Sequence, residues 1–375
     1  MLDNLLDLGF SDYMFPVTGE SVPRCLRPSQ RSEFLEVQKL IMTQSMDLER
    51  GQHCSFQQGD PIPFKTQKVL GAGSSGQVDQ VMSLISFKTY ARKRILRRKA
   101  NTGRTPEAMR QFVVEIQTLK RLEHNHVVEF VGSYTDPKYI GLIMSPVAEM
   151  DLATYLDRTN GGGHGELRTF FGCLVKALEY LHENKVRHKD IKPQNILVDR
   201  GRVLFTDFGL AFDFTNADRS TTFNTVIGFT PRYCAPEVAM MDSRNTSSDI
   251  WSLGVVFLEM AAVLKGMTVN DIYEFFKTHG SRQEFVRTNP VALSEFVAEL
   301  ERRGSSLDNK PLQWVRQMLE TDQQSRPTSY QLSARIFDTD GRDEGNAAFC
   351  GICCSASDSD DDSDDDRYYG SDYNG

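Results

Sequence analysis

One stretch of this sequence constrains the fold and the chemistry more than any other. Residues 188–195 read His-Lys-Asp-Ile-Lys-Pro-Gln-Asn, and a second triplet, Asp-Phe-Gly, begins at Asp207. The two segments offer a carboxylate at Asp190 and a cation at Lys192. Asp207 and Asn195 add the hard oxygen ligands that Mg²⁺ prefers. The pattern predicts phosphoryl transfer, in which a protein mainly positions groups and neutralises charge.

Each of these four residues has a predicted role. We expect Asp190 to orient the attacking hydroxyl and Lys192 to face the transferring phosphoryl group. We expect Asn195 and Asp207 to hold the metal ion. Each residue alone could be an ordinary polar loop residue, but chance does not readily produce the ordered set.

A glycine-rich turn lies between two strand-like runs farther upstream. Residues 71–78 read Gly-Ala-Gly-Ser-Ser-Gly-Gln-Val. Gly71, Gly73 and Gly76 would let backbone N–H groups approach phosphate oxygens. Alone, this pattern also fits a flexible hairpin. It differs from a dinucleotide-binding fingerprint, which opens a helix, because Val78 begins another strand.

A lysine and a glutamate complete the predicted nucleotide site. Lys93 lies in the next strand-like run, where it would place a positive charge on the α and β phosphates of ATP. Strand lysines are usually solvated edge residues. Glu115 lies in the middle of the following helical segment and could hold Lys93 in an ion pair. Such a pair would orient the lysine.

The type of element changes along the chain. Strand-like runs are expected between residues 67 and 95 and between 127 and 144, with one helix between them. Beyond Met150 helices dominate, and this order indicates an α+β fold with two lobes. The longest apolar run, Trp251 to Leu264, is shorter than the roughly 20 residues that span a membrane and is predicted to be a buried helix.

These motifs, in this order and at these separations, resemble the eukaryotic protein kinase family, serine/threonine type, across residues 64–338. Residues 133–139 also resemble orphan kinases of filamentous fungi. The resemblance implies a bilobal protein kinase fold. Its N-terminal lobe, residues 64–144, would be an antiparallel β lobe with one helix, and its larger C-terminal lobe, residues 148–338, mainly helical. It further implies that ATP and Mg²⁺ are cofactors and that proteins are the substrates.

The resemblance also places the nucleotide between the lobes. It implies that the hinge backbone hydrogen-bonds the adenine and that an acid holds the ribose. The implied ATP-binding residues are Leu70, Gly71, Gly73, Gly76, Val78, Ala91, Lys93, Glu115, Met144, Ser145, Val147, Asp151 and Leu197. Three more residues are implied to be structural. Asp249 would anchor the catalytic loop, and Glu237 and Arg326 would form a buried ion pair.

The activation segment carries one match and one departure. Thr230 and Lys192 match the serine/threonine subgroup. Lys189 stands where the family usually has an arginine, and a lysine cannot form the same bidentate fork with a phosphate. Control by phosphorylation is therefore an open question. We hypothesise that one hydroxyl of this segment is modified, and mass spectrometry of active enzyme tests it; the candidates are Ser220, Thr221, Thr222 and Thr225.

Charge and composition set off the two ends of the chain. The net charge is -8, of which -7 belongs to residues 355–375, so no basic surplus indicates nucleic acid as a partner. Residues 1–63 are predicted to be an accessory extension, and residues 339–375 a disordered acidic tail. No secretion signal or transmembrane segment is recognised, so we expect the cytoplasm or the nucleus.

Three of the seven cysteines, Cys350, Cys353 and Cys354, lie together near the end of the chain. Zinc takes four ligands, and no histidine or fourth cysteine is near them in the sequence, so an intramolecular zinc site is not expected. Acylation could attach these cysteines to a membrane, but the acidic run beside them opposes binding to an anionic surface. Membrane association through the tail is therefore not expected either, and labelling with palmitate in cells tests it.

Two other interpretations remain open. A pseudokinase would bind nucleotide without turnover, although every expected catalytic position is filled. An interaction protein would act through its extension and tail, and retained cellular function of residues 64–338 alone would count against it. The sequence leaves open the protein substrates, the pathway, the activator and the oligomeric state.

Overall fold

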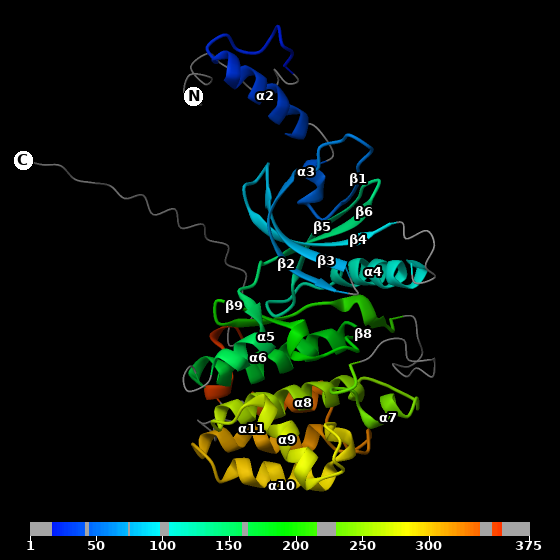
Figure 1. The fold of residues 1–375 in the computed structure, drawn as a ribbon, viewed down its shortest axis with the longest axis vertical. Helices are drawn as coiled ribbons and strands as arrows, with labels where there is room; N and C mark the ends of the chain where they lie inside the picture. Colours follow the sequence, from blue (N-terminus) through cyan, green and yellow to red (C-terminus); the bar gives the residue numbers. More distant parts are fainter. Residues whose placement is uncertain are drawn as a thin grey trace, which may run out of the picture.

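The computed structural model describes residues 17–41, 45–73, 76–97, 105–159, 164–215, 230–337 and 347–354. These residues form a β-rich lobe and a larger helical lobe, with α2 (Pro28–Ile41) at the far end of the β-rich lobe (Figure 1). The α+β architecture predicted from the sequence is confirmed. The interface between the lobes is where the predicted motifs meet.

A six-stranded sheet forms the N-terminal lobe, in the order β1-β5-β6-β4-β3-β2. Strands β2 to β6 pair with antiparallel neighbours, whereas β1 runs parallel to β5. One long helix, α4 (Thr105–Leu119), accompanies the sheet. The strands are β1 (His53–Ser55), β2 (Phe64–Gly73), β3 (Gly76–Ser83), β4 (Thr89–Leu96), β5 (Glu129–Thr135) and β6 (Tyr139–Ser145).

The sequence pattern predicts a strand from Ser86 to Ile95, and strand β4 begins three residues later, at Thr89. The Ser83 hydroxyl accepts hydrogen bonds from the backbone N–H groups of Ile85 (3.1 Å) and Ser86 (3.1 Å). These bonds hold the chain in a turn before the strand, as a serine side chain can do at the end of an element.

Part of the predicted accessory extension completes the N-terminal lobe. The short helix α3 (Ser45–Leu48) precedes β1. Leu48, Cys54 and Phe56 are buried in one cluster with sheet residues such as Tyr134. Burial of apolar side chains thus fixes these residues on the sheet.

The C-terminal lobe packs around two buried helices, α6 (His164–Glu183) and α8 (Ser247–Leu264). The short strands β7 (Met150–Asp151), β9 (Ile196–Asp199) and β10 (Arg202–Phe205) form one small sheet, and β8 (Val186–Arg187) and β11 (Phe212–Asp213) form another. The other helices are α5 (Leu152–Arg158), α7 (Pro236–Ala239), α9 (Val269–His279), α10 (Pro290–Glu301), α11 (Lys310–Met318) and α12 (Ser329–Ile336).

Helix α8 is long and apolar enough to cross a membrane by composition, but it lies inside the lobe. Of its apolar window, 94% is buried against other parts of the chain. The predicted buried core helix is therefore confirmed, and it begins at Ser247, four residues before the apolar run.

The tail prediction is wrong for residues 347–354. Two 3₁₀ turns, Ala347–Phe349 and Ile352–Cys354, lie against α6 (orange-red in Figure 1). Phe349 is fully buried, with its ring edge-to-face against Phe171 (5.9 Å) and Trp314 (5.4 Å). The composition of the tail did not predict this contact, because a single aromatic residue, Phe349, holds the segment in place.

Candidate active site between the lobes

A cavity of about 550 Å³ opens between the two lobes. Strands β2, β3, β4 and β6 line it from above, and β9 and the Asp-Phe-Gly segment from below. It brings together most of the residues predicted to bind ATP: Leu70, Gly71, Gly76, Val78, Ala91, Lys93, Glu115, Met144, Asp151 and Leu197, together with Asn195 and Asp207.

Three predicted ATP-binding residues lie outside the wall of this cavity. Gly73 ends β2, and Ser145 and Val147 flank Pro146, which does line the cavity. Sequence reasoning missed other lining residues, among them Val128, Ala148, Glu149 and Thr206. These residues follow or precede strands and carry no chemical signature, so only the fold reveals them.

The backbone conformation at position 76 requires a glycine. Its φ is +120°, in a region that side chains rarely adopt. A Cβ atom at this position would lie 2.4 Å from the Arg94 carbonyl oxygen. By contrast, a Cβ atom at Gly71 would meet nothing within 4 Å. Ser74 and Ser75 lie outside the described residues.

Lys93 joins the upper and lower walls of the cavity. Its Nζ donates to Glu115 Oε1 (2.8 Å) and Oε2 (2.7 Å) and to Asp207 Oδ1 (2.9 Å). Burial alone would lower the pKa of Lys93, but the two carboxylates outweigh it and raise that pKa. The predicted pairing of Lys93 with Glu115 is thus present in the structure.

Asp207 stands at the junction of this ion pair and the catalytic loop. Its backbone is left-handed, with φ +62°, which aspartate tolerates better than most residues. Burial acts to raise the pKa of Asp207, yet Lys93 holds that pKa below its ordinary value. Asp207 is therefore a carboxylate at neutral pH.

Asp190, Lys192, Asn195 and Thr230 form one hydrogen-bonded network. Lys192 Nζ donates to Asp190 Oδ2 (2.6 Å) and to the Thr230 hydroxyl (3.0 Å), and that hydroxyl donates to Asp190 Oδ1 (2.8 Å). Asn195 Nδ2 donates to both the backbone oxygen and Oδ2 of Asp190, each at 2.9 Å. The amide nitrogen is thus committed to Asp190, which leaves the carboxamide oxygen as the atom that can bind a cation.

Asp249, at the start of α8, fixes the chain just before Asp190. Its carboxylate accepts the backbone N–H groups of His188 and Lys189, each at 2.9 Å, and lies 3.2 Å from His182 Nε2. Burial would raise the pKa of Asp249, but these donors lower it. His188 itself is buried, with its ring 4.8 Å from that of Phe208, which fits a packing role.

Glu237 and Arg326 form a buried bidentate pair. Arg326 donates to Glu237 Oε1 (2.7 Å) and Oε2 (2.9 Å), and the side-chain exposures are 0% for arginine and 8% for glutamate. The guanidinium also donates to the carbonyls of Glu320, Ser247 and Thr321. The pair joins α7 to the segment that precedes α12.

The modification candidates Ser220, Thr221, Thr222 and Thr225 lie outside the described residues. Among the described residues, Lys189 lies near two other cations, Arg187 and Arg244. Loss of hydration among the surrounding protein atoms is the main cause that lowers the pKa of Lys189, and the charges of Arg187 and Arg244 lower it further. The residue is nevertheless exposed at the surface.

With this geometry in place, comparison with known proteins identifies the family. The family model for the protein kinase domain matches residues 64–337, and the chain belongs to this family. Its relatives include "Mitogen-activated protein kinase kinase kinase ANP1" of Arabidopsis thaliana, 30% identical over 203 residues, which are 53% of this chain and 30% of the relative.

Two further relatives have similar identity. "Serine/threonine-protein kinase fused" of Drosophila melanogaster is 34% identical over 200 residues, or 53% of this chain and 24% of the relative. "Serine/threonine protein kinase ypkA" of Aspergillus fumigatus is 34% identical over 215 residues, or 56% of this chain and 33% of the relative. The matched region thus spans a third or less of each of these proteins.

Proposed function

We propose that this protein is a serine/threonine protein kinase that transfers the γ-phosphoryl group of ATP to hydroxyl groups of proteins. The observation that carries the proposal is the convergence of two networks at one cavity. One network joins Lys93, Glu115 and Asp207, and the other joins Asp190, Lys192 and Asn195.

Asp190 is the residue that would receive and orient the substrate hydroxyl. Its carboxylate is held from three sides by Lys192, Asn195 and Thr230, so its position is fixed before substrate binds. Positioning of this kind supplies much of the catalysis in phosphoryl transfer. Lys192 would face the phosphoryl group as charge develops on it.

The residues present fit ATP with Mg²⁺. Asn195 offers its carboxamide oxygen and Asp207 its carboxylate, and both line the cavity. These two residues would hold Mg²⁺, which would supply the positive charge that neutralises the phosphates. Lys93, oriented by Glu115, would bind the α and β phosphates.

The serine/threonine preference is supported by Thr230. Its hydroxyl bonds to both Asp190 and Lys192, so Thr230 lies beside the carboxylate that would receive the acceptor hydroxyl. We also propose that one of the four hydroxyl residues between positions 216 and 229 is phosphorylated. The cations Lys189, Arg187 and Arg244 would bind its phosphate. Mass spectrometry that finds this segment unmodified in active enzyme would reject this second point.

A degenerate peptide library with radiolabelled ATP and Mg²⁺ tests the proposed activity. We expect label on serine and threonine in the wild type and almost none with Asp190→Asn. A protein that binds ATP but labels no peptide would be the pseudokinase. Label that is confined to tyrosine would contradict the proposed substrate class.

A further inference from the structure

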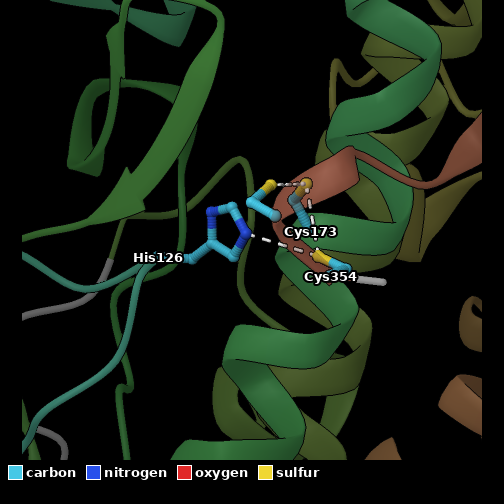
Figure 2. Close-up of side chains that lie close together, drawn as sticks. His126, Cys173 and Cys354 are labelled. Atoms are coloured by element: carbon cyan, nitrogen blue, oxygen red, sulfur yellow. Dashed lines mark hydrogen bonds between the residues drawn. The ribbon is translucent and has the colours of Figure 1, made fainter. Parts of the chain in front are cut away.

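Four side chains of the types that can bind a metal ion, from three parts of the chain, meet on the helical lobe, and none of them lines the ATP cavity. His126 precedes β5, Cys173 lies in the middle of α6, and Cys353 and Cys354 belong to the docked tail. Their ligand atoms all lie within 4.8 Å of one another. Figure 2 shows His126, Cys173 and Cys354 turned toward one another. The sequence argument against a zinc site rested on the lack of a histidine and a fourth cysteine nearby in the chain, and the fold brings both to the tail cysteines.

The separations fit a shared metal ion. Cys173 Sγ lies 3.7 Å from Cys353 Sγ and 3.6 Å from Cys354 Sγ, and His126 Nε2 lies 3.4 Å from Cys354 Sγ. A tetrahedral Zn²⁺, with Zn–S of about 2.3 Å and Zn–N of about 2.0 Å, places sulfur atoms about 3.8 Å apart and nitrogen about 3.5 Å from sulfur. A disulfide would need about 2.05 Å between two sulfur atoms.

The histidine is prepared for this role. Its Nδ1 lies 2.8 Å from the Val203 carbonyl oxygen, which can only accept, so the proton is on Nδ1. Nε2 then presents its lone pair to the cysteines. Such a carbonyl contact is the usual support for a metal-binding histidine, and His126 as a whole is only 1% exposed.

The backbone around the cysteines is shaped to bring the tail close. A Cβ atom on Gly351 would lie 2.8 Å from Cys353 Sγ and 3.0 Å from Cys173 Sγ. A Cβ atom on Gly172 would lie 2.6 Å from the Phe349 carbonyl oxygen. Only glycine fits at these two places without displacing the cluster or the tail.

We infer that His126, Cys173, Cys353 and Cys354 form a structural Zn²⁺ site that fastens the C-terminal segment to the helical lobe. Four protein ligands close the coordination shell, which is the pattern of a structural site and leaves no position for a reacting water. On binding, one Zn²⁺ replaces the three thiol protons, which leave to solvent.

The site would also tie the tail to the floor of the ATP cavity. The backbone oxygen of His126 accepts from Phe205 N (2.9 Å), and Val128 N donates to Phe205 O (3.0 Å). Phe205 ends β10, two residues before Asp207. Zinc would thus brace the segment that leads into the metal-binding aspartate.

Metal analysis of the full chain tests the site. Protein made in zinc-supplemented medium and then passed through a desalting column should hold about one zinc ion per chain. Cys173→Ser and the double change Cys353→Ser with Cys354→Ser should hold none. Cys350→Ser is the matched control, because Cys350 lies in the same segment but outside the ligand group, and it should keep its zinc.

Cobalt provides a readout that does not depend on whether a variant folds. Co²⁺ added to zinc-free wild-type protein should give the intense visible bands of tetrahedral coordination with thiolate charge transfer, and zinc should abolish them. Wild-type protein with neither zinc nor this spectrum would overturn the inference. So would full zinc occupancy in the double variant, or a Cys173 disulfide found by non-reducing peptide mapping.

Discussion

Removal of Arg326 should destabilise the kinase domain more than removal of its partner Glu237. Arg326→Met would leave the Glu237 carboxylate buried without a counter-charge and would free three backbone carbonyls that now accept from the guanidinium. Breaking a buried pair on one side costs about 3–5 kcal/mol, and the freed carbonyls place this variant at the upper end. Glu237→Met leaves those carbonyl bonds intact and should cost about 3 kcal/mol.

Thermal unfolding followed by fluorescence measures this difference. A domain of this size loses roughly 2 °C in Tm for each kcal/mol, so Arg326→Met should unfold roughly 8–10 °C below the wild type. The double variant with methionine at both positions removes both charges and should lose less stability than the sum of the two single losses, with a coupling of about 1–3 kcal/mol. A fall of less than about 2 °C in Arg326→Met, or strictly additive losses in the double variant, would refute the reasoning.

Three other predictions follow from single contacts. Glu115→Gln should reduce kcat/KM about 10- to 100-fold because Lys93 loses the carboxylate that orients it, and an unchanged value would contradict this role. Gly76→Ala should lower Tm while Gly71→Ala should not, since only the first places a Cβ atom against Arg94; equal effects would oppose it. Burial raises the pKa of Glu259 to about 7 from its ordinary 4.5, so the native state keeps a proton that the unfolded chain releases. The free energy of unfolding therefore falls by about 3 kcal/mol as pH rises from about 4.5 to about 7. Glu259→Gln does not titrate, so its Tm should gain on that of the wild type over this range. A Tm difference that stays constant with pH would contradict this prediction.

The local patterns of the sequence were enough to predict the two lobes and the core of the site. The strand-like runs around residues 77–82 and 139–144 became β3 and β6. Buried residues alternate along β3, whereas residues 141–144 of β6 are buried in succession. The motif residues Asp190, Asn195 and Asp207 carry their chemistry in their side chains, so their types and spacing predicted their convergence. Lys93 and Glu115 could be paired because each sits on a regular element.

Contacts that join distant parts of the chain were beyond the sequence pattern. Strand β1 pairs with β5 across about eighty residues, and no local period records which edge a short strand will join. Phe349 is one aromatic residue in a polar segment, and its buried site exists only after Phe171 and Trp314 have come together. Rules based on sequence spacing also cannot find a ligand set that comes from three separate segments. His126 and Cys173 are far from the tail cysteines in the sequence and meet them only in the fold.

The most direct test of the proposed catalysis separates binding from chemistry in one variant. Asp190→Asn keeps the shape of the side chain and removes the carboxylate that would receive the substrate proton. ATP affinity in the presence of Mg²⁺ should stay close to that of the wild type, because Asp190 does not line the nucleotide cavity. The rate of phosphoryl transfer to a peptide should fall about 10²- to 10⁴-fold. Transfer at the wild-type rate would contradict the account of this site.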